Sequence, residues 1–189
     1  YSSARHNYEP MGIADQTTEL NIRAVMLAQE ARDRMADRDV WIAGAVSTYP
    51  NWISDPGALG RTQFGAAGLG RIRRRGQLPP EQMLDNLKEQ AQVLADAGVD
   101  FIIAESTGNI EQKTWAVEAA AETGIPFWTA FNCNADPEQP GARVGYNTEL
   151  PMAAGMDKVL AFGGDVFLVF HSPLDATDKA LDTVFERFS

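Results

Sequence analysis

Three side chains that can do chemistry lie at or just beyond the ends of short apolar stretches. Glu105 ends the run F-I-I-A, Cys133 lies just past the run P-F-W-T-A-F, and His171 directly follows V-F-L-V-F. A carboxylate can hold an amine, and an imidazole can bind a metal or move a proton. Two simpler interpretations stay open: Glu105 caps the next helix or pairs with an arginine, and His171 bonds to the backbone at a strand end. We interpret Cys133 as a small buried residue.

The stretches that carry these residues are predicted to be buried strands, because they are short and rich in β-branched or aromatic residues. Between them lie segments with apolar residues at three- and four-residue spacing, the pattern of amphipathic helices. The predicted strands are 40–46, 101–105, 126–131 and 166–170, and the predicted helices are about 17–36, 80–97, 110–123, 148–162 and 174–188. Strict alternation of the two predicts an α/β fold with a parallel sheet. Chemistry in such folds gathers at the carboxyl ends of the strands.

Two of the predicted helices have an apolar side that we expect to face inward. These sides are Leu20, Ala24, Leu27, Ala28, Ala31 and Met35 in the first helix, and Leu181, Val184 and Phe185 in the last. Segments 1–14, 47–79 and 132–146 are predicted to be irregular, because glycine and proline interrupt them. The long loop 47–79 is of a length typical of a lid, an interface arm or a mobile segment. Gly44, inside a predicted strand, indicates a close backbone approach.

The totals fit one globular domain. The chain has 189 residues, of which 44% are hydrophobic and 22% charged. A net charge of -10 argues against nucleic acid as a partner, and no apolar run is long enough to predict a membrane span. The single cysteine, Cys133, excludes an intrachain disulfide and favours a reducing, cytoplasmic location. No charged-then-apolar leader follows Tyr1, and we expect the chain to be part of a longer protein.

Four segments, in this order, resemble the homocysteine S-methyltransferase family, which includes the betaine-dependent enzymes. They are Y-S-S-A-R (1–5), E-L-N-I-R-A-V-M-L-A-Q-E-A-R (19–32), W-I-A-G-A-V-S-T-Y-P (41–50) and A-G-V-D-F-I-I-A-E-S-T (97–107), and W-A-V-E (115–118) is most similar to the betaine-type members. The resemblance implies a (β/α)8 TIM barrel. Residues 1–189 would form a single partial barrel domain that runs from the end of strand 2 to helix 6. Strands 1, 7 and 8 would be missing.

The resemblance also implies roles for individual residues. Glu105 matches the carboxylate that receives the amino group of homocysteine, and Gly44 lies in the family's substrate-binding turn. Tyr1 matches a tyrosine on the methyl-donor side, where Trp52 is a second aromatic candidate, since an aromatic face suits an onium cation. The family holds zinc with three cysteines, and His171 takes the position of the first of them as a metal ligand. The other two fall in strand 8, so this chain alone does not complete the zinc site.

The implied function is transfer of a methyl group from an onium donor, of the betaine or S-methylmethionine type, to the thiol of homocysteine or a similar acceptor. Two alternatives stay open: a non-catalytic barrel remnant that has lost its zinc site and binds a ligand or a partner chain, and a barrel enzyme with metal-free chemistry. An open partial barrel exposes strand edges and apolar surface. We therefore expect a homo-oligomer, or a further segment of chain, to complete the barrel.

Overall fold

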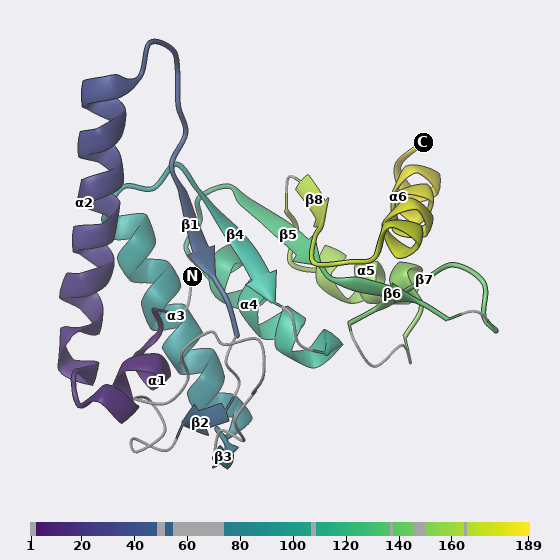
Figure 1. Cartoon of the computed structure of the whole chain (residues 1–189), viewed down its shortest axis with the longest axis horizontal. Helices are drawn as coiled ribbons and strands as arrows, with labels where there is room; N and C mark the ends of the chain where they lie inside the picture. The colour runs from purple at the N-terminus through teal and green to yellow at the C-terminus, as the bar shows by residue number, and fades with distance from the viewer. Residues whose placement is uncertain are drawn as a thin grey trace, which may run out of the picture.

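The computed structural model describes residues 3–48, 52–54, 74–106, 109–136, 138–145, 150–164 and 166–189, with the backbone alone at 52–54, 74–77 and 106. Within these ranges helices and strands alternate along much of the chain (Figure 1). In chain order they are α1 (Arg5–Tyr8), two 3-10 turns (Glu9–Met11 and Ala14–Gln16), α2 (Thr17–Met35), β1 (Ala43–Val46), β2 (Trp52–Ser54), β3 (Arg74–Gln77), α3 (Pro80–Asp96), β4 (Phe101–Ser106), α4 (Ile110–Glu122), β5 (Phe127–Phe131), β6 (Cys133–Ala135), β7 (Ala142–Val144), α5 (Met152–Leu160), β8 (Val166–Val169) and α6 (Leu174–Phe188).

The main sheet has four strands in the order β1-β4-β5-β8, and every neighbouring pair is parallel. This confirms the predicted α/β fold with a parallel sheet. Across the sheet Val46 lies beside Ala104, Glu105 beside Ala130, and Ala130 beside Leu168. The carboxyl ends of the strands therefore meet along one edge, as parallel pairing requires. Among the strands described, β1 and β8 each pair with one neighbour only, so the sheet is compatible with part of a barrel and closure remains a prediction.

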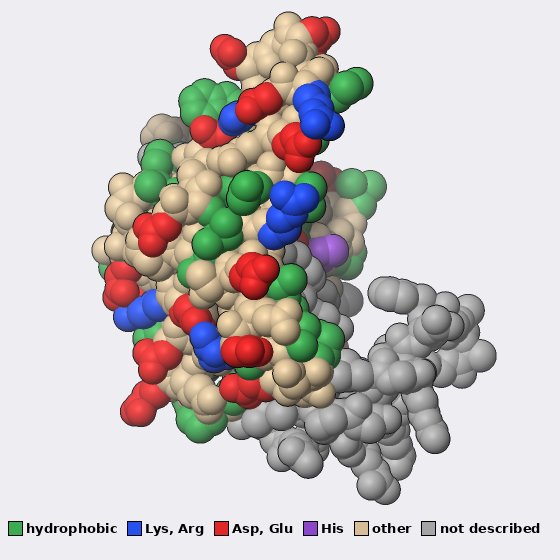
Figure 2. All heavy atoms as spheres, turned by 90° about the vertical axis from the view of Figure 1, so that its left-hand side faces the viewer, with side chains coloured by type: hydrophobic (Ala, Val, Ile, Leu, Met, Phe, Trp, Pro, Cys, Tyr) green, Lys and Arg blue, Asp and Glu red, His purple; other side chains and the backbone are tan. Residues whose placement is uncertain are grey.

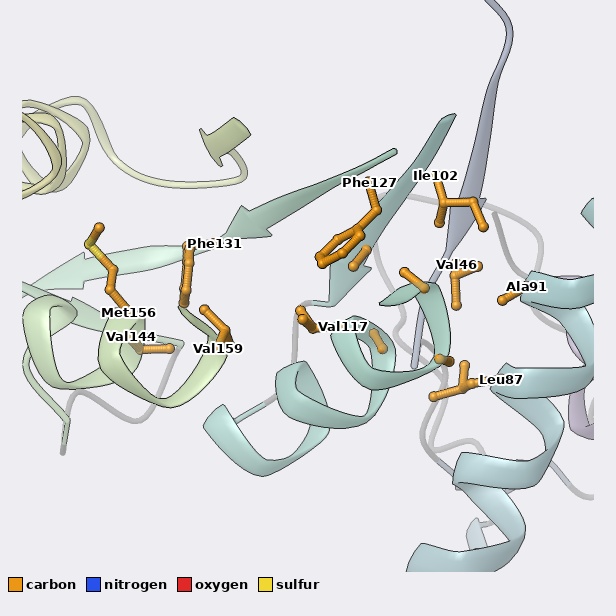
Figure 3. Packing of buried hydrophobic residues seen from close by; sticks show 14 of the residues in the cluster. Val46, Leu87, Ala91, Ile102, Val117, Phe127, Phe131, Val144, Met156 and Val159 are labelled. Carbon is orange, nitrogen blue, oxygen red and sulfur yellow. The ribbon is translucent and has the colours of Figure 1, made fainter. Parts of the chain in front are cut away.

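One face of this sheet is packed against helices. Ile102 and Ala104 of β4 are buried on this face, because successive side chains of a strand point to opposite sides. Helices α3 and α4 cover them with Leu87 and Ala91 from the first and Val117 from the second (Figure 3). The glycine that follows α3, Gly98, has a φ of 86°, which permits the sharp turn into β4. Packing against the layer of helices thus fixes the position and direction of β4, the strand that carries Glu105.

The other face of the sheet is only partly covered. Phe101, Ile103 and Glu105 on β4 are half-buried, and so is Trp128 on β5. The rings of Phe101 and Trp128 pack with centroids 4.2 Å apart. In a barrel this face would be the interior, where side chains fill the centre and the carboxyl ends of the strands form the site.

The predicted inward sides of the first and last helices are wrong for most of their residues. Helix α2 buries Thr17, Asn21 and Val25, while Leu27 and Met35 are exposed. Polar contacts place it this way, since the Asn21 amide donates to the backbone carbonyls of Ser3 and Thr17, and Gln29 donates to that of Ala97. Apolar and charged side chains mix on the surface that carries α2 (Figure 2). Likewise α6 buries the small residues Ala176 and Ala180, whereas Leu181 and Phe185 are exposed. Val184, as predicted, packs against the core.

The segments predicted to be irregular contain short elements. Residues 1–14 include α1, one 3-10 turn and the first residue of another, and the antiparallel pair β2–β3 lies within 47–79. Residues 132–146 contain the antiparallel pair β6–β7, whose turn is made by Asp136 and Gly141. The Asp136 carboxylate accepts from the backbone N–H of Glu138 at 2.9 Å, and Gly141 has a φ of 78°. Such turns are built by side chain-to-backbone bonds, which hydrophobic periodicity does not detect.

Other helix and strand boundaries in the structure differ from the predicted ones by a few residues. The strand predicted to end at Phe170 ends at Val169, and the helix predicted from 148 begins at Met152. Proline at 151 takes the position before the first helical residue, where its missing N–H costs nothing. Of the helices in the described ranges, none is both long and apolar enough to cross a bilayer.

Candidate active site

Glu105 and His171 come together at the carboxyl edge of the sheet. Glu105 lies near the end of β4, and His171 follows the end of β8 by two residues. The distance between His171 Nε2 and Glu105 Oε1 is 3.8 Å, with the two side chains 58% and 23% exposed. Strand β5 lies between them and presents Ala130 beside Glu105. Because a methyl group is the whole side chain there, the carboxylate and the imidazole can meet across the middle strand.

A short turn fixes the position of His171. Its φ is 47°, the left-handed region that residues with a side chain seldom adopt. Ser172 holds the turn on one side, because its Oγ donates to the carbonyl of Phe170 and accepts from the N–H of Cys133, both at 2.8 Å. On the other side the ring of Phe170 packs on the imidazole, with centroids 4.8 Å apart. The strained backbone is therefore tied to the start of β6, which favours a positioned imidazole over a freely moving one.

The described residues bear on both open alternatives for Glu105. The cap of α4 is Asn109, whose side chain accepts from the backbone N–H of Gln112 at 3.0 Å. In the described part of the chain, the ion-pair partner of Glu105 is His171 and not an arginine. At 3.8 Å the two groups attract each other when the imidazole is protonated, but they are too far apart for a hydrogen bond. A gap of this size leaves the carboxylate able to take another cation as a partner.

A buried lysine that was not predicted from the sequence lies beside the residue that follows β5. Lys113 in α4 is 1% exposed, and its Nζ donates to Asn132 Oδ1 at 2.7 Å. The same Nζ lies 5.5 Å from the ring centroid of Phe131 and 5.9 Å from that of Phe170. Burial lowers the pKa of Lys113 to about 7, and the nearby sulfur of Cys133 opposes this shift. A signal for Lys113 was present, since it lies three residues before Ala116 on the apolar side of its helix.

Cys133 is buried, as interpreted from the sequence. It is 1% exposed, and its Sγ lies 3.6 Å from Sδ of Met152 in α5. Burial raises the pKa of the thiol to about 11, while the charge of Lys113 opposes this effect. The thiol is therefore protonated at neutral pH, which makes Cys133 a packing residue and not a nucleophile.

The structure does not bring Gly44 together with Glu105. Gly44 pairs with Ile102 and faces the helix layer, where an added Cβ would lie 3.2 Å from side-chain atoms of Leu94 and Val99. The predicted close approach is thus confirmed, but the approaching groups belong to the core. Tyr1 lies outside the described residues, and so does the side chain of Trp52.

The described residues do not fit the zinc site that the resemblance implies. Within the ranges described, no three His, Cys, Asp or Glu side chains gather as a metal site would require. Glu105 and His171 are two possible ligands, and a protein zinc site needs at least three.

A comparison with known protein families shows to which family the chain belongs. The model of the homocysteine S-methyltransferase family matches residues 1–165. The chain belongs to the homocysteine S-methyltransferase family. No curated protein matches the sequence. As a member of this methyltransferase family, the chain carries Glu105 and Lys113 within the matched range, whereas the match ends just before β8 and leaves His171 outside it.

Proposed function

We propose that the protein transfers a methyl group from an onium donor to the thiol of homocysteine or a closely similar acceptor. The observation that carries this proposal is the position of Glu105, within the family match, on the less covered face of the sheet and at its carboxyl edge. A partly buried carboxylate at that edge can hold the ammonium group of an amino-acid acceptor by a charge-assisted hydrogen bond. Such a bond fixes the acceptor's orientation before the reaction.

In this proposal His171 takes the proton of the acceptor thiol. A thiol is mostly protonated at neutral pH, and the thiolate is the nucleophile. The thiolate sulfur then forms a bond to the donor's methyl carbon as the bond from that carbon to the donor's nitrogen or sulfur breaks. The donor leaves as a neutral amine or thioether, and the proton stays on the imidazole until solvent removes it. The half-exposed position of His171 suits that exchange.

The donor side and the metal are the parts of the proposal that depend on residues outside the described ranges. Tyr1 and Trp52 are proposed to offer aromatic faces to the onium cation. Of the described residues, His171 is the group proposed to take the thiol proton, at 3.8 Å from Glu105. The second candidate is a non-catalytic member that binds a ligand or a partner chain.

Methyl transfer with an isotopically labelled donor separates the two candidates. We expect labelled methionine when the protein is incubated with homocysteine and a betaine-type or S-methylmethionine-type donor. Glu105→Gln is expected to raise KM for homocysteine by about 10- to 100-fold, because it removes a charged hydrogen-bond partner. His171→Ala is expected to lower kcat by about 100-fold or more, as loss of a general base does.

The matched control is Glu138→Gln, the same change in the exposed turn between β6 and β7, which should leave both constants unchanged. Absence of any labelled product with both donor types, from a folded protein, contradicts the catalytic proposal and supports the non-catalytic one.

Completion of the barrel is also proposed. Exposed apolar residues lie on the two helices at the ends of the sheet, Met26 and Leu27 on α2 and Phe185 and Phe188 on α6. Surfaces of this kind are usually covered by a neighbour. We expect another copy or a further segment of chain to cover them, and size measurement in solution tests which.

A further inference from the structure

Asn132 carries a buried hydrogen-bond donor that nothing in the fold explains. The residue directly follows β5 and is fully buried. Its Oδ1 accepts from Lys113 and its backbone carbonyl accepts from the N–H of Gly145. Its Nδ2, in contrast, has no hydrogen-bond partner among the residues that the structure describes. A buried donor without an acceptor costs stability, so a retained one needs a reason.

Lys113 determines which way this amide points. Lys113 Nζ donates to the amide oxygen of Asn132, so the amide nitrogen faces away from the lysine. The lysine itself has little freedom, because it is buried beside the rings of Phe131 and Phe170. The direction of the Asn132 donor is therefore set by a rigid neighbour.

The alternation along the chain places Asn132 on the same face of the sheet as Glu105. Phe131 belongs to the face covered by α5, since an added Cβ at Gly155 would lie 3.7 Å from its ring (Figure 3). Cys133 also faces α5, where its sulfur touches Met152. The side chain between two such residues points to the opposite face. Ala130, which lies beside Glu105, is two residues before Asn132, so the amide lies one strand repeat, about 7 Å, beyond the carboxylate level.

We propose that Asn132, oriented by Lys113, recognises the carboxylate of the amino-acid acceptor whose ammonium group Glu105 holds. This inference rests on the proposed function and adds to it a specificity residue and a positioning residue. The amide donor bonds a carboxylate oxygen by a charge-assisted hydrogen bond, and the protonated form of Lys113 behind it adds attraction for an anion. Glu105 on β4 and Asn132 just after β5 then bind the two charged groups of one amino acid. The site therefore selects α-amino-acid thiols over simple aminothiols.

The test compares two thiols that differ only in the carboxylate. Binding of L-homocysteine and of 3-mercaptopropylamine to the full chain is measured by calorimetry. The wild-type protein is expected to bind homocysteine about 10- to 100-fold more tightly than the amine. Asn132→Asp replaces the donor with a like charge of the same shape, and the new carboxylate pairs with Lys113, which preserves the fold. This variant is expected to lose the preference, because its affinity for homocysteine falls while that for the amine stays within about twofold.

Two further variants make the result specific. Asn134→Asp, the same change one strand position beyond Cys133 on β6, should keep the wild-type preference. Lys113→Met leaves the amide free to turn, so it should reduce the preference without removing binding of the amine. Wild-type preference in a folded Asn132→Asp protein overturns the inference and leaves the role of Glu105 standing. Failure of the wild-type chain to bind either thiol overturns the proposed function and the inference together.

Discussion

Burial of Lys113 predicts a stability that depends on pH in a defined direction. The pKa of this lysine falls from 10.5 to about 7 in the folded protein because the ammonium group is desolvated. The folded state therefore loses this proton near neutral pH, whereas the unfolded chain keeps it until about pH 10.5. Where the unfolded state binds more protons, stability rises with pH. The contribution of Lys113 is thus least favourable below pH 7 and improves as pH rises above it.

The size of the effect follows from the shift. Each pH unit between the folded and unfolded pKa values is worth about 1.4 kcal/mol, so two units above neutrality give about 3 kcal/mol. The free energy of unfolding is measured by urea titration for the wild-type protein and for Lys113→Met at about pH 5 and about pH 9. Methionine has similar length and no charge. We expect the stability of the wild type relative to the variant to increase by about 3 kcal/mol over this range.

Comparison with the variant cancels the titration of the other groups. The control is Lys158→Met on the exposed side of α5, whose difference from the wild type should be flat. The pH range stops below the raised pKa of Cys133, about 11. A flat difference for Lys113→Met as well would show that Lys113 keeps an ordinary pKa and would refute the reasoning from burial.

Two glycine substitutions test the packing that supports the site. Gly155→Ala should destabilise the protein by about 1–3 kcal/mol in thermal or urea unfolding, because the new Cβ would lie 2.5 Å from a methyl group of Val144. An exposed helix position gains stability from the same change, so stabilisation would contradict the close contact of α5 with β7. Gly44→Ala should also destabilise, by about 1 kcal/mol or more, since Leu94 and Val99 must yield to it; equal stability would show that the core beneath β1 is loosely packed.

The order of strands and helices could be predicted because it depends on local patterns. The run from Phe101 to Ala104 is too short for a helix, and glycines 98 and 124 end the helices before their strands with positive φ. Parallel pairing then follows from alternation, and it brings Glu105 and His171 to the same edge. Glu105 and His171 can meet across β5 because Ala130 is small, and this residue can be seen in the sequence.

Other features could not be predicted because they depend on which neighbours are present. The apolar sides of α2 and α6 are real patterns, but no described element covers Leu27 or Phe185, and each helix packs mainly through small or polar residues instead. Lys113 was overlooked because a lysine is usually at the surface, and here Asn132 and two aromatic rings accommodate it. In both cases tertiary contacts override what a residue type alone would indicate.

The central claim is that Glu105 holds the ammonium group of the acceptor. Its most direct test is the affinity of the full chain for L-homocysteine and for N-acetylhomocysteine, which lacks the ammonium group, measured for the wild type and for Glu105→Gln. We predict that Glu105→Gln weakens homocysteine binding by about 10- to 100-fold and leaves the weak binding of the acetylated compound unchanged. Equal affinity of the wild-type and Glu105→Gln proteins for homocysteine would contradict the account.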